Sequence, residues 1–270
     1  MIGPPERTTD MDLRHLLTTA ALCTFFAACS DNRLEEKGFQ VGPTRVEGGT
    51  SAPIGLNMDS PTFATRPSAV LLTGVQHIRL TTVYKVNLNK EDSSTFIGSN
   101  DRHYDYEEER THLNNWNGHL MPGFEAVYGY NLVNVSHYDV RTDRSRFLYD
   151  QPVLIKTLYY PSFSSDTLNG APVTRDHFLV TVYDEDTNKD GFVNTRDLRR
   201  MHLFDVNGVR MNDPIAANYS VFGSTYDPAN DRMHIFAKLD TNHNGGVEEQ
   251  EPVHIHWIDL KDPARSGRLY

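Results

Sequence analysis

Two stretches of twelve residues carry oxygen-bearing side chains at the spacing that suits a hard divalent cation. They occupy 186–197 (DTNKDGFVNTRD) and 240–251 (DTNHNGGVEEQE). Ca²⁺ takes six to eight oxygen ligands, and a loop of this length can supply them from positions 1, 3, 5, 7, 9 and 12, with glycine at position 6 for the sharp turn. Both stretches satisfy all of these positions, so the sequence predicts two calcium sites.

The predicted ligands occupy equivalent positions of the two loops. In the first loop they are Asp186, Asn188, Asp190, the carbonyl of Phe192, Asn194 and Asp197; in the second they are Asp240, Asn242, Asn244, the carbonyl of Gly246, Glu248 and Glu251. Each set carries three carboxylates, which repel one another when no cation lies between them. Aspartate at position 12 is shorter than glutamate and less suited to bidentate contact, so we expect the first site to be the weaker one.

These twelve-residue patterns resemble the EF-hand loop, and the first copy, which ends in aspartate, looks like the dockerin version. The resemblance covers the two loops alone. Their flanks, 178–183 and 198–206 for the first and 233–239 and 253–260 for the second, are rich in β-branched and aromatic residues in rough alternation. We therefore expect each loop to connect two strands, in place of the helices of an EF-hand. The open alternative is that Asp, Asn and Gly form ordinary turns here.

The similarity of the two regions continues past the loops. Seven identities fall between 186–206 and 240–260, and the last two lie outside the loops: Asp186/Asp240, Thr187/Thr241, Asn188/Asn242, Gly191/Gly245, Val193/Val247, His202/His256 and Asp205/Asp259. Chance predicts about one, so this is an internal repeat. A weaker copy at 133–140 places Asp139 with Asp205 and Asp259.

The repeat predicts an all-β fold. One unit is interpreted as strand, turn, strand, metal loop, strand, turn, strand, which resembles a β-propeller blade of the TolB-like or WD type. The length available allows about four antiparallel four-stranded units. A partial propeller or an open β-sandwich is the alternative architecture, and 91–123 is interpreted as an insertion into the β-repeat domain of residues 67–270.

The beginning of the chain has the pattern of an export signal. Charged residues precede an apolar run at 16–28, which is too short to span a bilayer, and Cys29 follows Phe26, Ala27 and Ala28. This resembles a bacterial lipobox and implies cleavage before Cys29, lipidation of Cys29 and a cell-envelope location, with the outer membrane favoured. An ordinary signal peptide or a buried helix is the alternative. Residues 1–29 are then the signal peptide, and 30–66, rich in Gly, Pro, Ser and Thr, are predicted to be a flexible tether.

Other candidate chemistry is weaker. Trp116, Tyr104 and Tyr106 lie on the insertion and are a candidate ligand or partner surface, with a loop anchored to the core as the alternative. His254 and His256 are two apart, so both side chains point to one face of a strand, a geometry that can bind metal. A repeat-packing role explains His202 and His256 more simply, because they hold equivalent positions in their units. No nucleophile motif such as GxSxG, and no Walker loop, occurs in the sequence.

These observations favour a non-enzymatic, calcium-binding, lipid-anchored envelope protein that binds a protein or glycan partner. The formal net charge of −10 and isoelectric point near 5.6 argue against nucleic acid as a partner. A secreted hydrolase of polysaccharide or peptide, stabilised by calcium, is the alternative function, and a dockerin-like adaptor is a third.

Overall fold

The computed structural model describes residues 38–40, 63–88, 95–97, 100–101 and 121–270. Contacts divide the chain into two units, Met1–Arg33 and Leu34–Tyr270, and all described residues belong to the second. Within them every element is a β-strand, and every strand pair is antiparallel. The predicted all-β, antiparallel class is therefore confirmed. In this part of the chain there is no apolar helix of membrane-spanning length.

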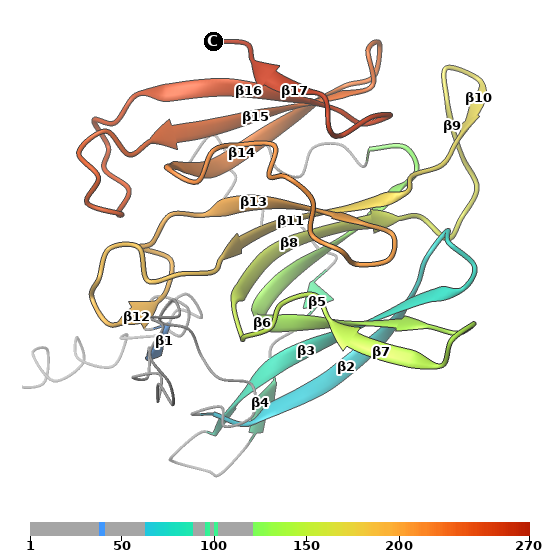
Figure 1. The fold of residues 1–270 in the computed structure, drawn as a ribbon, viewed down its shortest axis with the longest axis horizontal. Coiled ribbons are helices and arrows are strands. Elements are labelled where there is room, and N and C mark those ends of the chain that lie inside the picture. The colour runs from blue at the N-terminus through green and yellow to red at the C-terminus, as the bar shows by residue number, and fades with distance from the viewer. Residues whose placement is uncertain (1–37, 41–62, 89–94, 98–99, 102–120) are drawn as a thin grey trace, which may run out of the picture. The chain divides into compact units, whose positions relative to one another are not determined.

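Nine strands form the larger sheet. They are β2 (Thr65–Leu72), β3 (Ile78–Leu88), β4 (Thr95–Ile97), β5 (Asn100–Asp101), β6 (Phe124–Asp139), β7 (Arg144–Phe147), β8 (Leu154–Pro161), β11 (His177–Tyr183) and β13 (Arg200–Asp205). The main order is β13-β11-β8-β6-β3-β2, with β4 paired to β3 and both β5 and β7 paired to β6 (Figure 1). The long strand β6 thus pairs with β3, β5, β7 and β8.

Four more strands form a second sheet. They are β14 (Tyr219–Asp227), β15 (Arg232–Leu239), β16 (Val253–Asp259) and β17 (Ser266–Arg268), paired in chain order. Two ribbons of two strands complete the description: β9 (Asp166–Leu168) with β10 (Ala171–Val173), and β1 (Phe39–Gln40) with β12 (Phe192–Val193). In Figure 1 the orange and red four-stranded sheet lies beside the β13 edge of the larger sheet.

The sheets match the predicted repeat in one copy and depart from it in the other. The downstream copy is a four-stranded sheet with the second loop between its two middle strands, as predicted. The strands of the upstream copy, β8, β11 and β13, lie side by side inside the nine-stranded sheet. No propeller is present in the described residues, so the blade count stays a prediction.

A shared apolar cluster joins the two sheets. It contains Leu179 of β11, Met201 and Leu203 of β13, and Ile235 and Ile258 of the smaller sheet, all nearly or fully buried. Alternate residues of β11 point the other way, into a second cluster with β3, β6 and β8. Strand β11 is buried on both faces, which explains its almost continuous apolar sequence. Packing of two sheets through one core favours the sandwich alternative over separate blades.

A buried ion pair connects the two sheets at the end opposite the metal loops. Arg175 donates from Nη1 and Nη2 to the two carboxylate oxygens of Asp231, each at 2.8 Å, and both side chains are only 1% exposed. The same guanidinium donates to the carbonyls of Leu260 and Pro122. Burial is the largest single influence on the pKa of Asp231 and would raise it, but the hydrogen bonds and charge of Arg175, together with Tyr226 and Lys261, lower the pKa overall. Arg175 thus ties the turn before β15 and the end of β16 to the larger sheet.

The repeat also explains three aspartates at strand ends. Asp139, Asp205 and Asp259 each end a strand and accept a backbone N–H of the following turn. The donors are Arg141 N at 2.9 Å, Val209 N at 2.7 Å and Lys261 N at 3.0 Å, respectively. Asp139 of the weaker upstream copy and Asp259 both accept the N–H two residues later, whereas Asp205 accepts the N–H four residues later.

The structure describes parts of the predicted tether and of the predicted insertion. Within the predicted tether of 30–66, Phe39–Gln40 form β1 and residues 65–66 begin β2. Within the predicted insertion, β4, β5 and residues 121–123 are described, and 102–120 lie outside the described residues.

Candidate metal centre

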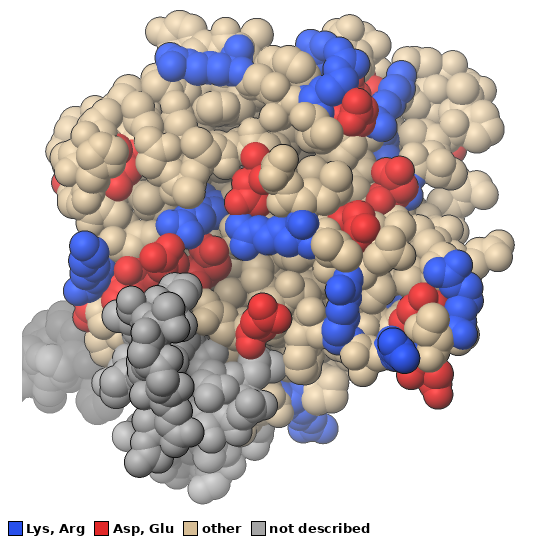
Figure 2. Space-filling model, in the orientation of Figure 1, with Lys and Arg blue, Asp and Glu red and all other residues tan. Residues whose placement is uncertain are grey.

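Both predicted metal loops are hairpin connections. Strands β11 and β13 pair antiparallel around the first, and β15 and β16 pair antiparallel around the second. The prediction that each loop connects two strands is confirmed. Figure 2 shows acidic side chains gathered around the connection that Figure 1 labels β12, close to basic side chains.

The two loops share an unusual backbone conformation at the same two positions. At position 4, Lys189 has φ 61° and His243 has φ 57°; at position 6, Gly191 has φ 87° and Gly245 has φ 73°. Positive φ is uncommon outside glycine because Cβ crowds the backbone. Two such positions in each loop, at equal spacing, define one loop conformation that occurs twice.

The first aspartate of each loop closes the turn in the same way. One carboxylate oxygen accepts the N–H of position 5 and the other accepts the N–H of position 6. These contacts are Asp190 N to Asp186 Oδ1 at 3.0 Å and Gly191 N to Asp186 Oδ2 at 2.9 Å, and then Asn244 N to Asp240 Oδ1 at 3.2 Å and Gly245 N to Asp240 Oδ2 at 3.0 Å. The predicted first ligands are thus fixed inside their loops.

The side chains at positions 3 and 5 also repeat. Each accepts a backbone N–H two residues later, so its oxygen is held along the inside of the turn. The contacts are Asp190 N to Asn188 Oδ1 at 3.0 Å, Phe192 N to Asp190 Oδ1 at 3.0 Å, Asn244 N to Asn242 Oδ1 at 2.9 Å and Gly246 N to Asn244 Oδ1 at 2.9 Å. The described loops therefore bring positions 1, 3 and 5 together in both copies.

The twelfth positions differ between the loops. Both oxygens of buried Asp197 accept backbone N–H groups, from Thr187 at 2.9 Å on Oδ1 and from Asn194 at 2.7 Å on Oδ2. Burial raises the pKa of Asp197 to about 6, although these N–H groups oppose the shift. In the second loop, Glu251 Oε2 accepts the N–H of Glu248 at 3.1 Å, while the buried Oε1 has no hydrogen-bond partner.

An orphaned carboxylate oxygen is costly in a protein interior unless a cation or donor meets it. Glu251 Oε1 therefore fits a cation ligand, whereas Asp197 is already engaged in closing its own loop. The difference supports the expectation that the first site is the weaker one.

The residues at position 9, Asn194 and Glu248, make different hydrogen bonds in the two loops. Asn194 Oδ1 accepts the N–H of Arg196 at 2.7 Å, and the guanidinium of Arg196 lies 2.9 Å from Asp190 Oδ2. Glu248 Oε1 accepts from the side-chain amides of Asn242 at 3.2 Å and Asn244 at 2.6 Å. Arg196, at position 11 of the first loop, is therefore a positive charge paired with a predicted ligand of that loop, and Glu248 is joined to two other predicted ligands of the second.

The chemistry of this donor set is that of a hard-cation site. Among the described residues no three His, Cys, Asp or Glu side chains converge on one point. Asparagine and carbonyl oxygens make up half of each predicted set, and these suit Ca²⁺ and not the softer transition metals. The residues present fit calcium, the second loop better than the first.

The two loops touch each other, which their separation in sequence did not indicate. The hydroxyl of Thr187 donates to the carbonyl of Gly245, and Asp197 pairs with Gly246 in an isolated antiparallel bridge. A Cβ on Gly245 would lie 1.9 Å from the carbonyl oxygen of Thr187. The backbones of the first and second loops are therefore in direct contact with each other.

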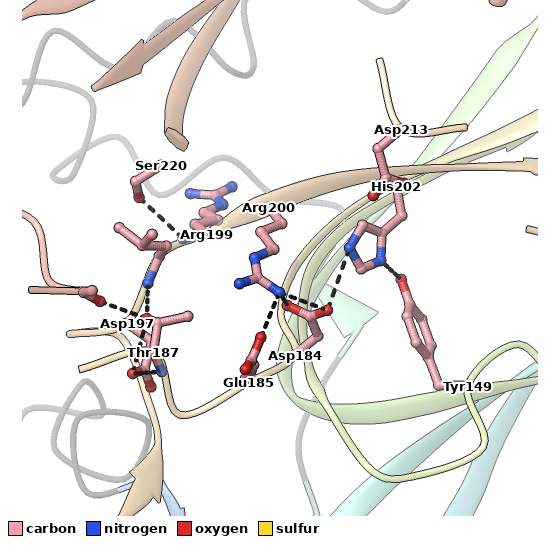
Figure 3. Close-up of polar contacts among 12 residues, drawn as sticks. Tyr149, Asp184, Glu185, Thr187, Asp197, Arg199, Arg200, His202, Asp213 and Ser220 are labelled. Carbon is pink, nitrogen blue, oxygen red and sulfur yellow. Dashed lines mark hydrogen bonds and ion pairs between the residues drawn. The ribbon is translucent and has the colours of Figure 1, made fainter. Parts of the chain in front are cut away.

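A polar cluster, buried in part, adjoins the first loop through Asp184 and Glu185, which directly precede it (Figure 3). His202 of β13 lies with Nδ1 3.0 Å from the hydroxyl of Tyr149 and with Nε2 3.5 Å from Asp184. Arg200 contacts Asp184 at 3.3 Å and Glu185 at 2.9 Å. Burial raises the pKa of Asp184, and the Arg200 cation opposes the shift. Sequence spacing indicated His202 as a repeat position but gave no sign of these partners.

His202 predicts an acid-dependent loss of stability. Burial, together with Arg210 and Arg200, lowers its pKa from 6.5 to about 2. The unfolded chain therefore binds a proton below pH 6.5 that the folded chain excludes, so stability falls as pH decreases. From pH 7 to 5 this residue removes about 2 kcal/mol of unfolding free energy. Urea unfolding in chelator at pH 7 and 5 measures the loss. His202→Gln should show a smaller loss over the same interval, and an equal loss in both proteins would contradict the assignment.

The repeat equivalent of His202 has a different environment. His256 packs against the ring of Tyr219, with centroids 4.8 Å apart, and His254 Nδ1 lies 2.8 Å from the Tyr219 hydroxyl. Burial lowers the pKa of both histidines. The contact of His256 with Tyr219 fits the packing role predicted for His256.

The remaining predicted site residues have no described structure. Cys29, the proposed lipidation site, and Trp116, Tyr104 and Tyr106, the proposed ligand surface, lie outside the described residues.

Comparison with known proteins gives no family for this chain. No family model matches it, and no curated protein matches it either. Its function must therefore be inferred from its own residues.

Proposed function

We propose that this chain is a calcium-binding protein of the cell envelope, anchored by lipid at Cys29, whose β-domain is stabilised by two Ca²⁺ ions and has a non-enzymatic binding or scaffolding role. The observation that carries the calcium proposal is the duplicated loop geometry. Equivalent positions of the two loops have positive φ, and equivalent aspartate oxygens accept the N–H groups of equivalent residues. The orphaned Oε1 of Glu251 adds an acceptor in need of a cation.

Calcium would cross-link the oxygens of each loop and neutralise their charge. Asp186, Asn188 and Asp190 would hold one ion together with the carbonyl of Phe192. The corresponding residues of the second loop, with both oxygens of Glu251, would hold the other. A duplicated loop of ordinary Asx turns remains the simpler alternative, but it does not account for the buried and unpaired oxygen of Glu251.

The proposed role follows from energetics. An ion that binds only the folded state adds about 2.7 kcal/mol of stability at a hundredfold excess over Kd. Calcium modules outside the cytoplasm commonly have Kd values of about 0.1–1 mM, near the calcium concentration there. The ions would therefore be structural, with each site about half filled or more at that concentration. The lipid anchor rests on the lipobox-like sequence, and the outer membrane is favoured because Ser30, in place of Asp, follows Cys29. The proposed partner of the β-domain is a protein or a glycan.

Calorimetric titration of the full chain with Ca²⁺ tests this proposal. We expect two binding events and a rise in melting temperature with added Ca²⁺. Asp186→Ala and Asp240→Ala should each remove one event, because each deletes the residue that closes its loop. The tighter event should disappear with Asp240→Ala.

Asp262→Ala is the matched control, since Asp262 is an exposed acid outside both loops. It should retain both events. Absence of heat and of any thermal shift in the wild-type chain would refute the calcium proposal, as would loss of both events in the control.

A further inference from the structure

The first metal loop pairs with β1, a short strand in the segment that follows the proposed lipid anchor. Strand β1 pairs with β12, with Phe39 opposite Val193 and Gln40 opposite Phe192. Phe192 and Val193 are positions 7 and 8 of the loop, and the carbonyl of Phe192 is a predicted ion ligand. The same two residues therefore belong both to the proposed site and to the only described pairing partner of β1.

Packing around β1 is close and specific. Phe39 is 3% exposed and lies in an apolar cluster with Val83, Val133, Leu154 and Val193. Its ring stacks on Phe63 at 5.0 Å, and the ammonium of Lys85 lies 4.8 Å from the Phe39 centroid. Burying one phenylalanine against such a cluster contributes about 2 kcal/mol before the cost of ordering the segment.

Gly38 allows the chain to approach the loop. It has φ 63°, and a Cβ at this position would lie 2.1 Å from the carbonyl oxygen of Val193 and 2.5 Å from Cβ of Asn194. Both contacts are with residues of the first metal loop. No side chain fits here without moving either the loop or the N-terminal segment.

We propose that the first metal loop is a calcium-dependent clamp for the membrane-proximal segment, an inference that rests on the proposed function. Ion binding fixes the backbone of positions 7 and 8, which is the template on which β1 forms. Binding of the ion and docking of residues 38–40 are then thermodynamically linked, and each strengthens the other by the same factor.

The clamp would set the distance between the body and the membrane. Gly38 is nine positions after Cys29, and Phe63 is 34 positions after it. A fully extended chain spans at most roughly 3.5 Å per residue, so the reach is about 30 Å when β1 is docked and about 120 Å when it is released. Calcium would thus shorten the effective tether fourfold without any change in the folded sheets.

Hydrogen exchange of the full chain tests the clamp. In Asp240→Ala, which leaves only the first loop, saturating Ca²⁺ should slow amide exchange of Phe39 and Gln40 about tenfold, within the usual range for linked sites. Gly38→Ala in this background should abolish the slowing and weaken Ca²⁺ binding by a similar factor. Phe39→Ala should act in the same direction without a backbone clash.

Gly170→Ala is the matched control, because Gly170 also has positive φ but nothing within 4 Å of the added Cβ. It should change neither exchange of β1 nor calcium affinity. Calcium binding with unchanged exchange at Phe39 and Gln40 would overturn the clamp and leave the proposed function intact. Absence of calcium binding in the wild-type chain would overturn both.

Discussion

Arg175→Met should lower the unfolding free energy by about 3–5 kcal/mol, the usual cost of removing one partner of a buried ion pair. The methionine retains much of the arginine volume but leaves the Asp231 carboxylate buried at 1% exposure without its bidentate donor. The carbonyls of Leu260 and Pro122 lose donors as well. Urea unfolding followed by far-UV circular dichroism in chelator measures the loss.

Two further variants test the cause. Arg265→Met removes an ion pair with Asp259 in which the arginine is 62% exposed, and it should cost no more than about 1 kcal/mol. The double variant Arg175→Met with Asp231→Asn should recover part of the loss, because it removes the unpaired charge. Asparagine also tolerates the positive φ of 53° at position 231. Equal losses for Arg175→Met and Arg265→Met would contradict a role for burial.

Gly245→Ala should destabilise the chain by about 2–5 kcal/mol, combining the cost of a side chain at positive φ with the cost of overpacking. The added Cβ would lie 1.9 Å from the Thr187 carbonyl oxygen and 2.9 Å from Asn188 N, both backbone atoms of the other loop. Backbone atoms cannot rotate away as a side chain does, so the contact between the two loops must open.

Gly191→Ala is the matched comparison at the same position of the first loop. Its φ is 87°, but nothing lies within 4 Å of the added Cβ, so only the conformational cost of about 1–2 kcal/mol should appear. Thermal unfolding with and without Ca²⁺ separates the two effects. In Gly245→Ala the first loop should also lose calcium affinity, because Thr187 and Asn188 shift. A smaller effect at Gly245 than at Gly191 would show that the loops do not depend on their mutual contact.

Local sequence patterns predicted the strands well. Apolar and β-branched runs around both loops are β11, β13, β15 and β16, and the repeat predicted which strands flank each loop. Alternation and turn residues depend on neighbours in the chain, so the sequence contains this information directly. The assignment of strands to sheets depends on long-range pairing. The upstream repeat copy merges with β6 and β3, and no local pattern specifies that merger.

The sequence likewise predicted some features of the candidate site and not others. Oxygen ligands and turn glycines were predictable, because a loop that binds calcium needs fixed residue types at fixed spacing. The engagement of Asp197 by backbone N–H groups and the orphaned oxygen of Glu251 were not predictable. They depend on how deeply each loop end is buried, which the surrounding sheet decides.

By itself the sequence determined an antiparallel β-protein with two equivalent oxygen-rich hairpin loops, because periodicity and turn chemistry act within about a dozen residues. Only the tertiary structure decided that these loops touch through Thr187 and Gly245, and that Phe39 docks onto the first of them. Contacts between residues 58 or 154 positions apart form where buried apolar area and backbone pairing offset the entropy of closing long loops. That balance is a property of the whole packed chain.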